Sequence, residues 1–211
     1  PRKRAAGRTG LVESMRIGVL ALQGAFHEHQ VMLERLGAEV RQVRLPAHLD
    51  GLDGLIIPGG ESTTIGKLAV DFNLMEPLKT FAAEHALWGT CAGAIFMARE
   101  VGRPQPLLGL MDIVIERNAF GRQVASFETD LDVPALRHLN GGGKAYHAVF
   151  IRAPLIEAVR GTAQALVALP DGRIVAARQG RWLATSFHPE LTQDDRFHRY
   201  FLEMAQSKSE R

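Results

Sequence analysis

Residues 86–98, ALWGTCAGAIFMA, join a short apolar run to a series of good helix formers. Between the two lies the pattern Gly-x-Cys-x-Gly, with Gly89 and Gly93 two residues on either side of Cys91. A nucleophile on a sharp strand-to-helix turn needs small neighbours, because its backbone is strained and its side chain projects beyond the sheet. The following helix also favours the thiolate, since its amino-terminal end is partly positive. This stretch predicts a nucleophile elbow in an α/β protein.

A second motif, near the carboxyl end of the chain, supplies partners for that cysteine. Residues 182–187 have the pattern of a buried strand and run into His188-Pro189-Glu190, where the proline ends the strand. In open α/β sheets the active residues gather at such strand ends. His188 has the chemistry to exchange a proton with Cys91, while Glu190 accepts the other imidazole N–H. A lone cysteine is more often a small buried residue, so the pairing is what indicates nucleophilic thiol catalysis.

The rest of the chain alternates short apolar runs with helical patterns, as expected for a parallel sheet covered by helices. Residues 16–22 predict a strand and 25–36 a helix, with Gly37 where a helix cap would stand. A further strand over 54–58 runs directly into residues 59–64, GGESTT. The two glycines and the hydroxyl groups of residues 62–64 allow a tight turn that binds an anion through its backbone N–H groups. Gly59 and Gly60 by themselves are compatible with a simple strand-to-helix connection. We therefore expect a three-layer α/β fold with a mostly parallel central sheet.

Composition narrows the class of protein. The chain has 211 residues, of which 46% are hydrophobic and 23% charged, which fits one ordinary globular domain. One cysteine permits no internal disulfide, and the apolar runs are too short to span a bilayer, so we expect a cytoplasmic protein and no membrane partner. The formal charge is +2, but residues 1–14 carry four positive charges and one negative, so the remainder is at −1. This distribution argues against nucleic-acid binding.

Residues 1–14 lack an apolar segment and any clear periodicity, and a strand pattern begins directly after Met15. We interpret them as an early-start extension outside the fold, with a short basic targeting or docking arm as the alternative, and assign residues 15–211 to a single domain. His27 and His29 have a spacing that sends them to different faces of a helix, so we expect surface or interface roles and no metal site. Residues 137–147, which include three consecutive glycines, predict a surface loop beside the pocket or at a sheet edge.

Three segments in this order resemble the class I glutamine amidotransferases with their Cys-His-Glu triad: 58–64 (PGGESTT), 89–93 (GTCAG) and 186–190 (SFHPE). Three more stretches resemble the glutaminase subunits of pyridoxal 5'-phosphate synthase: 18–24 (GVLALQG), 116–123 (ERNAFGRQ) and 150–154 (FIRAP). The resemblance extends from Met15 to about Ala205. Together these segments are far more specific than any one of them.

The resemblance implies a role for each matching residue. Cys91 would attack the glutamine amide, with His188 moving the protons and Glu190 orienting His188. The N–H groups of Gly60 and Ala92 would hold the oxyanion. Glutamine recognition would fall to the residues in the remaining family motifs: Gly60, Glu61, Ser62, Arg117, Ile151 and Arg152.

The resemblance also implies that the chain hydrolyses L-glutamine and passes ammonia to a pyridoxal 5'-phosphate synthase subunit. No P-loop, dinucleotide fingerprint or Cys/His metal-ligand cluster occurs in the sequence, so we expect neither a nucleotide nor a metal cofactor. Other readings stay open: a γ-glutamyl peptide hydrolase, a non-catalytic binding module, or another class I glutaminase such as that of imidazole glycerol phosphate synthase. The motif at 116–123 argues against the other glutaminase, and an intact triad argues against the binding module.

Overall fold

The structure is a computed structural model that describes residues 15–116, 126–139, 141 and 143–207. The proposed extension at residues 1–14 lies outside the described residues, as does Arg117, so the domain boundary at Met15 stays a prediction. None of the helices in the described ranges is long and apolar enough to cross a membrane.

Twelve strands are described: β1 Arg16–Leu20, β2 Glu39–Val43, β3 Gly54–Ile57, β4 Ala86–Thr90, β5 Ala98–Val101, β6 Met111–Glu116, β7 Ser126–Leu131, β8 Tyr146–Ile151, β9 Leu155–Val159, β10 Gln164–Ala168, β11 Ile174–Gln179 and β12 Trp182–Thr185. Five α-helices connect or follow them: α1 Phe26–Arg35, α2 Ser62–Asp71, α3 Met75–Glu84, α4 Ala92–Met97 and α5 Arg196–Gln206. Three short 3-10 helices complete the set: η1 Pro46–Leu49, η2 Pro134–Leu136 and η3 Pro189–Leu191.

Ten strands form one sheet in which the order along the main path is β2-β1-β3-β4-β12-β11-β9-β6-β5, with β10 beside β11. The strands from β2 to β12 along this path are all parallel. Beyond β12, antiparallel pairing joins β11, β9 and β6, and a parallel pair with β5 ends the path. The sheet is therefore parallel where the predicted motifs lie. A separate antiparallel ribbon is made by β7 and β8.

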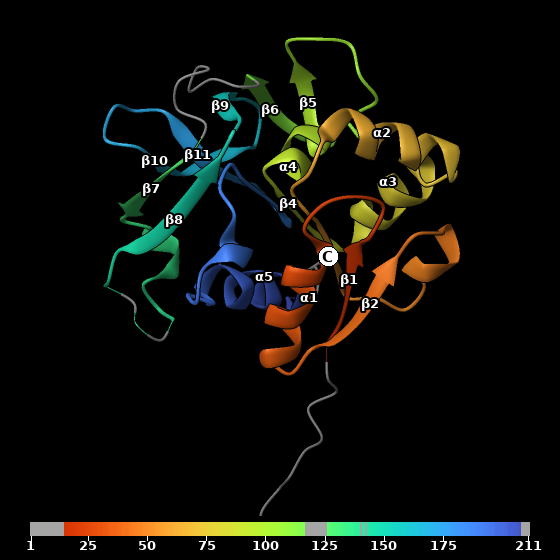
Figure 1. Cartoon of the computed structure of the whole chain (residues 1–211), viewed down its shortest axis with the longest axis horizontal. Coiled ribbons are helices and arrows are strands. Elements are labelled where there is room, and N and C mark those ends of the chain that lie inside the picture. Colours follow the sequence, from red (N-terminus) through yellow and green to blue (C-terminus); the bar gives the residue numbers. More distant parts are fainter. Residues whose placement is uncertain (1–14, 117–125, 140, 142, 208–211) are drawn as a thin grey trace, which may run out of the picture.

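Helices cover both faces of the sheet (Figure 1). One hydrophobic core contains residues of α2, α3 and α4 packed on inward-facing side chains such as Leu55, Ile57 and Leu87. The other core contains residues of α1, α5 and the β7–β8 ribbon packed on alternate positions such as Ile56 and Trp88. Because neighbouring residues of a strand point to opposite faces, a fully buried strand such as β3 serves both cores. This arrangement confirms the expected three-layer α/β fold.

The first βαβ unit matches the sequence prediction closely. Helix α1 has a buried face made by His29, Met32 and Leu33, and Gly37 follows it with a φ of 86°, which suits the left-handed turn that ends a helix. Strand β2 then pairs in parallel with β1. Local periodicity and one cap were enough to specify this unit.

The described part of the glycine-rich segment 137–147 is tied to the start of α5. Buried Arg196 donates hydrogen bonds to the carbonyl oxygens of Gly141, Lys144 and Ala145, at 3.3, 2.8 and 2.9 Å. Its guanidinium also contacts Asp194. One arginine thus provides hydrogen-bond donors for three backbone carbonyl groups that lie outside the β-sheet pairing. It thereby holds both ends of the turn in place.

Candidate active site

Cys91 is the first residue after β4 and precedes α4, as the elbow motif predicts. Its φ of 48° and ψ of −106° are unusual for a residue with a side chain, which confirms the expected backbone strain. A methyl group on Gly93 would lie 1.9 Å from the carbonyl oxygen of Ile57, and one on Gly89 would lie 2.6 Å from backbone atoms of Gly93. The two glycines are required because β3, β4 and the start of α4 approach one another too closely for a side chain.

The pairing of β4 with β12 brings the cysteine motif and the His-Pro-Glu motif to the same edge of the sheet. In this parallel pair Thr90 lies opposite Thr185, and the backbone N–H of Cys91 donates to the carbonyl oxygen of Thr185 at 2.8 Å. His188 follows β12 by only a few residues, so its imidazole emerges beside the cysteine. Residues almost a hundred positions apart in sequence become neighbours through strand register alone.

His188 and Glu190 are both buried, and the Nδ1 atom of His188 lies 2.7 Å from the Oε1 atom of Glu190. Burial alone would lower the pKa of His188, but hydrogen bonds with Cys91 and Glu190 raise it to about 10. Burial would likewise raise the pKa of Glu190, yet His29 and His188 lie against the carboxylate and hold that pKa below its ordinary value. The geometry therefore favours an imidazolium at His188 beside an ionised Glu190 carboxylate.

The turn after β3 forms the wall opposite the imidazole. A methyl group on Gly59 would lie 2.6 Å from Cε1 of His188, so only glycine lets the ring approach this turn. Gln23, which follows β1, accepts a hydrogen bond from the backbone N–H of Glu61 at 2.7 Å. Gly24 adopts a φ of 99°, and the N–H of Ala25 donates to Gly59 at 3.0 Å. The turns after β1 and β3 thus support each other.

Glu61 is the N-cap of α2. Its carboxylate accepts from the backbone N–H groups of Thr63 and Thr64 and from the Thr64 hydroxyl, at 3.2, 2.7 and 2.8 Å. Slight burial opposes the ionised form, but these hydrogen bonds outweigh it and lower the pKa of Glu61 to about 2. The side chain of this predicted substrate residue therefore also holds the start of α2.

These residues enclose a pocket of about 460 Å³. Its lining includes every predicted site residue that the structure describes: Gly60, Glu61, Ser62, Cys91, Ala92, Ile151, Arg152, His188 and Glu190. Arg117 lies outside the described residues. None of the described residues of the glycine-rich segment 137–147 lines the pocket, so the first of its two predicted positions is not supported.

Two polar side chains near the pocket were not assigned from sequence. Gln23 lines the pocket. Residues 16–24, like residues 54–60, are a strand pattern that ends in glycine, and this similarity could have placed Gln23 near the site. His29 was expected at a surface or interface, and this was wrong, because its side chain is fully buried against Glu190. The i+3 and i+4 spacing from His29 to Met32 and Leu33 placed it on the buried face of α1, whereas His27 is exposed.

Comparison with known proteins agrees with this geometry. Residues 19–207 match the SNO glutamine amidotransferase family. The chain belongs to this family. A relative from Herpetosiphon aurantiacus, named pyridoxal 5'-phosphate synthase subunit PdxT, is 61% identical and the alignment covers 89% of this chain and 99% of the relative. A relative of the same name from Deinococcus radiodurans is 57% identical, with 90% and 97% covered.

One solved structure supports the same family assignment, and a second supports the fold. A crystal structure of a glutamine amidotransferase is 50% identical, with a TM-score of 0.83, and covers 90% of this chain and 99% of its own. The structure of PurLQS from Thermotoga maritima is only 17% identical, with a TM-score of 0.67, and 90% of this chain and 98% of its own are covered. That second likeness concerns the fold alone. Within the SNO family, this chain thus has both the family's fold and a pocket that contains a cysteine, a histidine and a glutamate.

Proposed function

We propose that this chain hydrolyses L-glutamine to L-glutamate and ammonia and supplies the ammonia to a pyridoxal 5'-phosphate synthase subunit. The observation that carries the proposal is Cys91 on a strained turn in the pocket, next to a His188 whose Nδ1 atom lies 2.7 Å from Oε1 of Glu190. The curated relatives named as subunits of this synthase, 61% and 57% identical, support the choice of pathway and partner. The chain is a glutaminase of the amidotransferase class.

In the proposed reaction the Sγ atom of Cys91 attacks the side-chain amide carbon of glutamine. A C–S bond forms, the C–N bond breaks, and His188 delivers its proton to the departing nitrogen, so ammonia leaves and a γ-glutamyl thioester remains. Water then attacks the thioester with His188 as base, which frees glutamate and restores the thiol. Glu190 accepts the Nδ1–H of His188 throughout and stabilises the imidazolium.

Backbone N–H groups of Gly60 and Ala92 are proposed to bind the oxyanion that forms in both steps. Ala92 is the first residue of α4, where backbone N–H groups have no partner within the helix. Gly60 lies across the pocket, in the turn after β3. Each such donor is worth about 3 kcal/mol of transition-state stabilisation in comparable enzymes.

Recognition of glutamine is assigned to the other wall of the pocket. A free amino acid carries a carboxylate and an ammonium, so the exposed side chains of Arg152 and Glu61 offer complementary charges. The buried Ser62 hydroxyl lies 3.4 Å from the side-chain oxygen of Gln105, which orients it. Ile151 supplies apolar contact, and Arg117 is retained in this group on sequence grounds. A cytoplasmic location is part of the proposal, because the nucleophilic thiol has to stay reduced.

The test is glutamate release from glutamine by the purified chain, with and without the partner synthase subunit from the same organism. We expect release that the Cys91→Ala variant abolishes, together with selective labelling of Cys91 by a glutamine-analogue electrophile. Glutamate release that survives in Cys91→Ala would contradict the mechanism. If the rate of glutamate release is the same with and without the partner, the chain is still a glutaminase but the proposed pathway is contradicted. If no glutamate is released even with the partner, the proposed function is wrong.

A further inference from the structure

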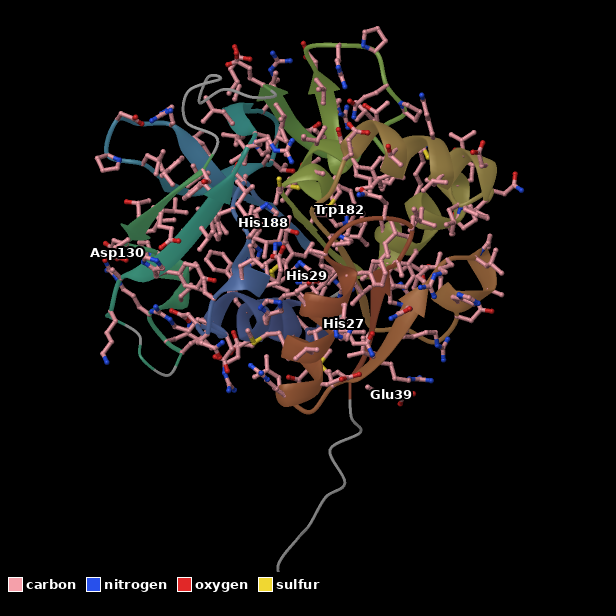
Figure 2. The ribbon with its side chains drawn as sticks, viewed as in Figure 1. His27, His29, Glu39, Asp130, Trp182 and His188 are labelled. Carbon is pink, nitrogen blue, oxygen red and sulfur yellow. The ribbon has the colours of Figure 1, made fainter. Side chains whose placement is uncertain are left out.

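Behind the triad lies a chain of buried polar side chains that the mechanism above does not use. His29 of α1 and His198 of α5 are fully buried, and Nδ1 of His29 lies 3.0 Å from Nε2 of His198. The other nitrogen of His29, Nε2, lies 3.2 Å from the hydroxyl of Thr90 and 3.3 Å from Oε2 of Glu190. The pair thus connects the helical layer to the catalytic carboxylate. Figure 2 labels His29 and His188 in the interior of the molecule.

The two carboxylate oxygens of Glu190 differ in their hydrogen bonding. Its Oε1 accepts from His188, whereas Oε2 is buried, makes no well-aligned hydrogen bond with any residue that the structure describes, and lies 3.3 Å from Nε2 of His29. A buried carboxylate oxygen without a donor is costly, and it raises the affinity of the carboxyl group for a proton. The Nε2 atom of His29 is the polar group placed to offset that cost.

The protonation of the two histidines follows from their surroundings. Burial, and then the neighbouring His29, hold the pKa of His198 well below its ordinary value, so this ring is neutral. Its Nδ1 has no hydrogen-bond partner among the described residues. Because a buried N–H without an acceptor is unfavourable, the single proton belongs on Nε2, which donates to Nδ1 of His29.

Burial also lowers the pKa of His29, and the neighbouring His188 lowers it further. The carboxylate of Glu190 raises this pKa, and Glu28 of the same helix raises it more weakly, but burial is the largest effect. A neutral His29 that accepts at Nδ1 carries its own proton on Nε2. That N–H then lies between the Thr90 hydroxyl and Oε2 of Glu190. His198 thereby sets the tautomer of His29, and His29 presents a donor to the catalytic carboxylate.

We propose that His29 is a positioning residue, which holds the second carboxylate oxygen of Glu190 and so keeps Glu190 ionised and aimed at His188. The inference rests on the proposed function, because it assigns a support to one member of the proposed triad. It also gives α1 and α5 a part in the site, since one histidine from each is needed. A merely structural buried histidine would stabilise the fold without changing the protonation of Glu190.

The test is a titration of the Glu190 carboxyl carbon by NMR in the purified chain, with Glu190→Gln to assign the signal. In His29→Leu the midpoint should rise by about one pH unit, because a buried carboxylate without the polar imidazole N–H beside it binds its proton more tightly. His29→Gln should stay close to the wild type, since its amide N–H reaches the position of Nε2. His27→Leu, an exposed position on the same helix, should also leave the midpoint unchanged.

If His29→Leu does not fold, His29→Asn replaces it, because the asparagine amide ends near Nδ1 and falls short of Glu190. Equal midpoints in the wild type, His29→Gln and the Leu or Asn variant would overturn the inference. The titration contains no glutamine, so it is separate from turnover. An unshifted midpoint in a chain that hydrolyses glutamine overturns this inference alone, whereas a chain without glutaminase activity overturns the proposed function.

Discussion

Cys91, His188 and Glu190 are buried where neighbouring parallel strands end, whereas the other wall of the pocket, made by Gly60, Glu61, Ile151 and Arg152, is exposed. The first group, here the catalytic side, is fixed by the register of β4 with β12 and by close backbone contacts. The second group, here the recognition side, comes from the turn after β3 and the end of β8. Changes on the catalytic side should therefore damage fold and activity together, while changes on the recognition side should separate them.

The strongest test of this difference is Gly93→Ala. The added methyl would lie 1.9 Å from a backbone oxygen of β3 that cannot move freely. We expect the free energy of unfolding to fall by about 3 kcal/mol, the upper part of the range for overpacking. We also expect kcat/KM to fall by roughly 100-fold, because the elbow shifts. Denaturant unfolding and glutamate release measure the two losses.

Gly102→Ala is the matched control for this change. A methyl group at residue 102 meets no atom within 4 Å, and the residue is exposed. This variant should leave both the stability and kcat/KM near the wild-type values. A Gly93→Ala variant that behaves in the same way would show that the catalytic side tolerates displacement.

On the recognition side, Arg152→Gly should change activity and stability in opposite directions. Arg152 adopts a φ of 44°, which is unfavourable for any residue with a side chain. Glycine relieves that strain, so the free energy of unfolding should rise by up to about 1 kcal/mol. If Arg152 binds the glutamine carboxylate, its loss should raise KM by about 10- to 100-fold.

Asn73 offers the comparison for Arg152, because it has a φ of 54° but does not line the pocket. Asn73→Gly should leave KM unchanged, with at most a small gain in stability. Steady-state kinetics and thermal unfolding of the two variants together separate backbone strain from substrate binding. A KM that is unaffected by Arg152→Gly would remove this arginine from recognition.

The smallest effect is expected for Glu61→Gln at the N-cap of α2. At neutral pH the variant should lose about 0.5–1 kcal/mol of stability, the usual range for a cap. The pKa of Glu61 is lowered to about 2 in the folded chain. Its contribution is therefore present above the ordinary glutamate pKa and disappears as the pH falls toward 2.

Unfolding curves of wild type and Glu61→Gln at several pH values check this sign. The difference between them should shrink on acidification and vanish near pH 2. Glu39→Gln, an exposed carboxylate on β2, serves as the control. A difference that grows as the pH falls would contradict the assigned cap.

The catalytic side was largely predictable from sequence because its signals are local. Gly89, Cys91 and Gly93 indicate the elbow within five residues, and Pro189 marks the end of a strand beside His188. The βαβ start at 16–43 was predictable for the same reason, since periodicity and a capping glycine are short-range features.

The contacts that assemble the site were not predictable in this way. Neither motif contains a signal that β12 lies beside β4, because parallel pairing over such a distance depends on the whole sheet. The burial of His29 was missed because its spacing from His27 was weighed more heavily than its spacing from Met32 and Leu33. The second role of Glu61 as a helix cap required the actual positions of two backbone N–H groups.

Strand β12 is the last strand in the described part of the chain, yet it lies in the middle of the sheet, between β4 and β11. During synthesis Cys91 leaves the ribosome almost a hundred residues before His188, so β4 is made well before β12, the strand that pairs with it and precedes the proposed base. If His188 is the base, a chain truncated before residue 188 should show no glutaminase activity, because β12 and the residues after it complete the site. The proposed triad therefore cannot be complete until the chain has been translated through Glu190.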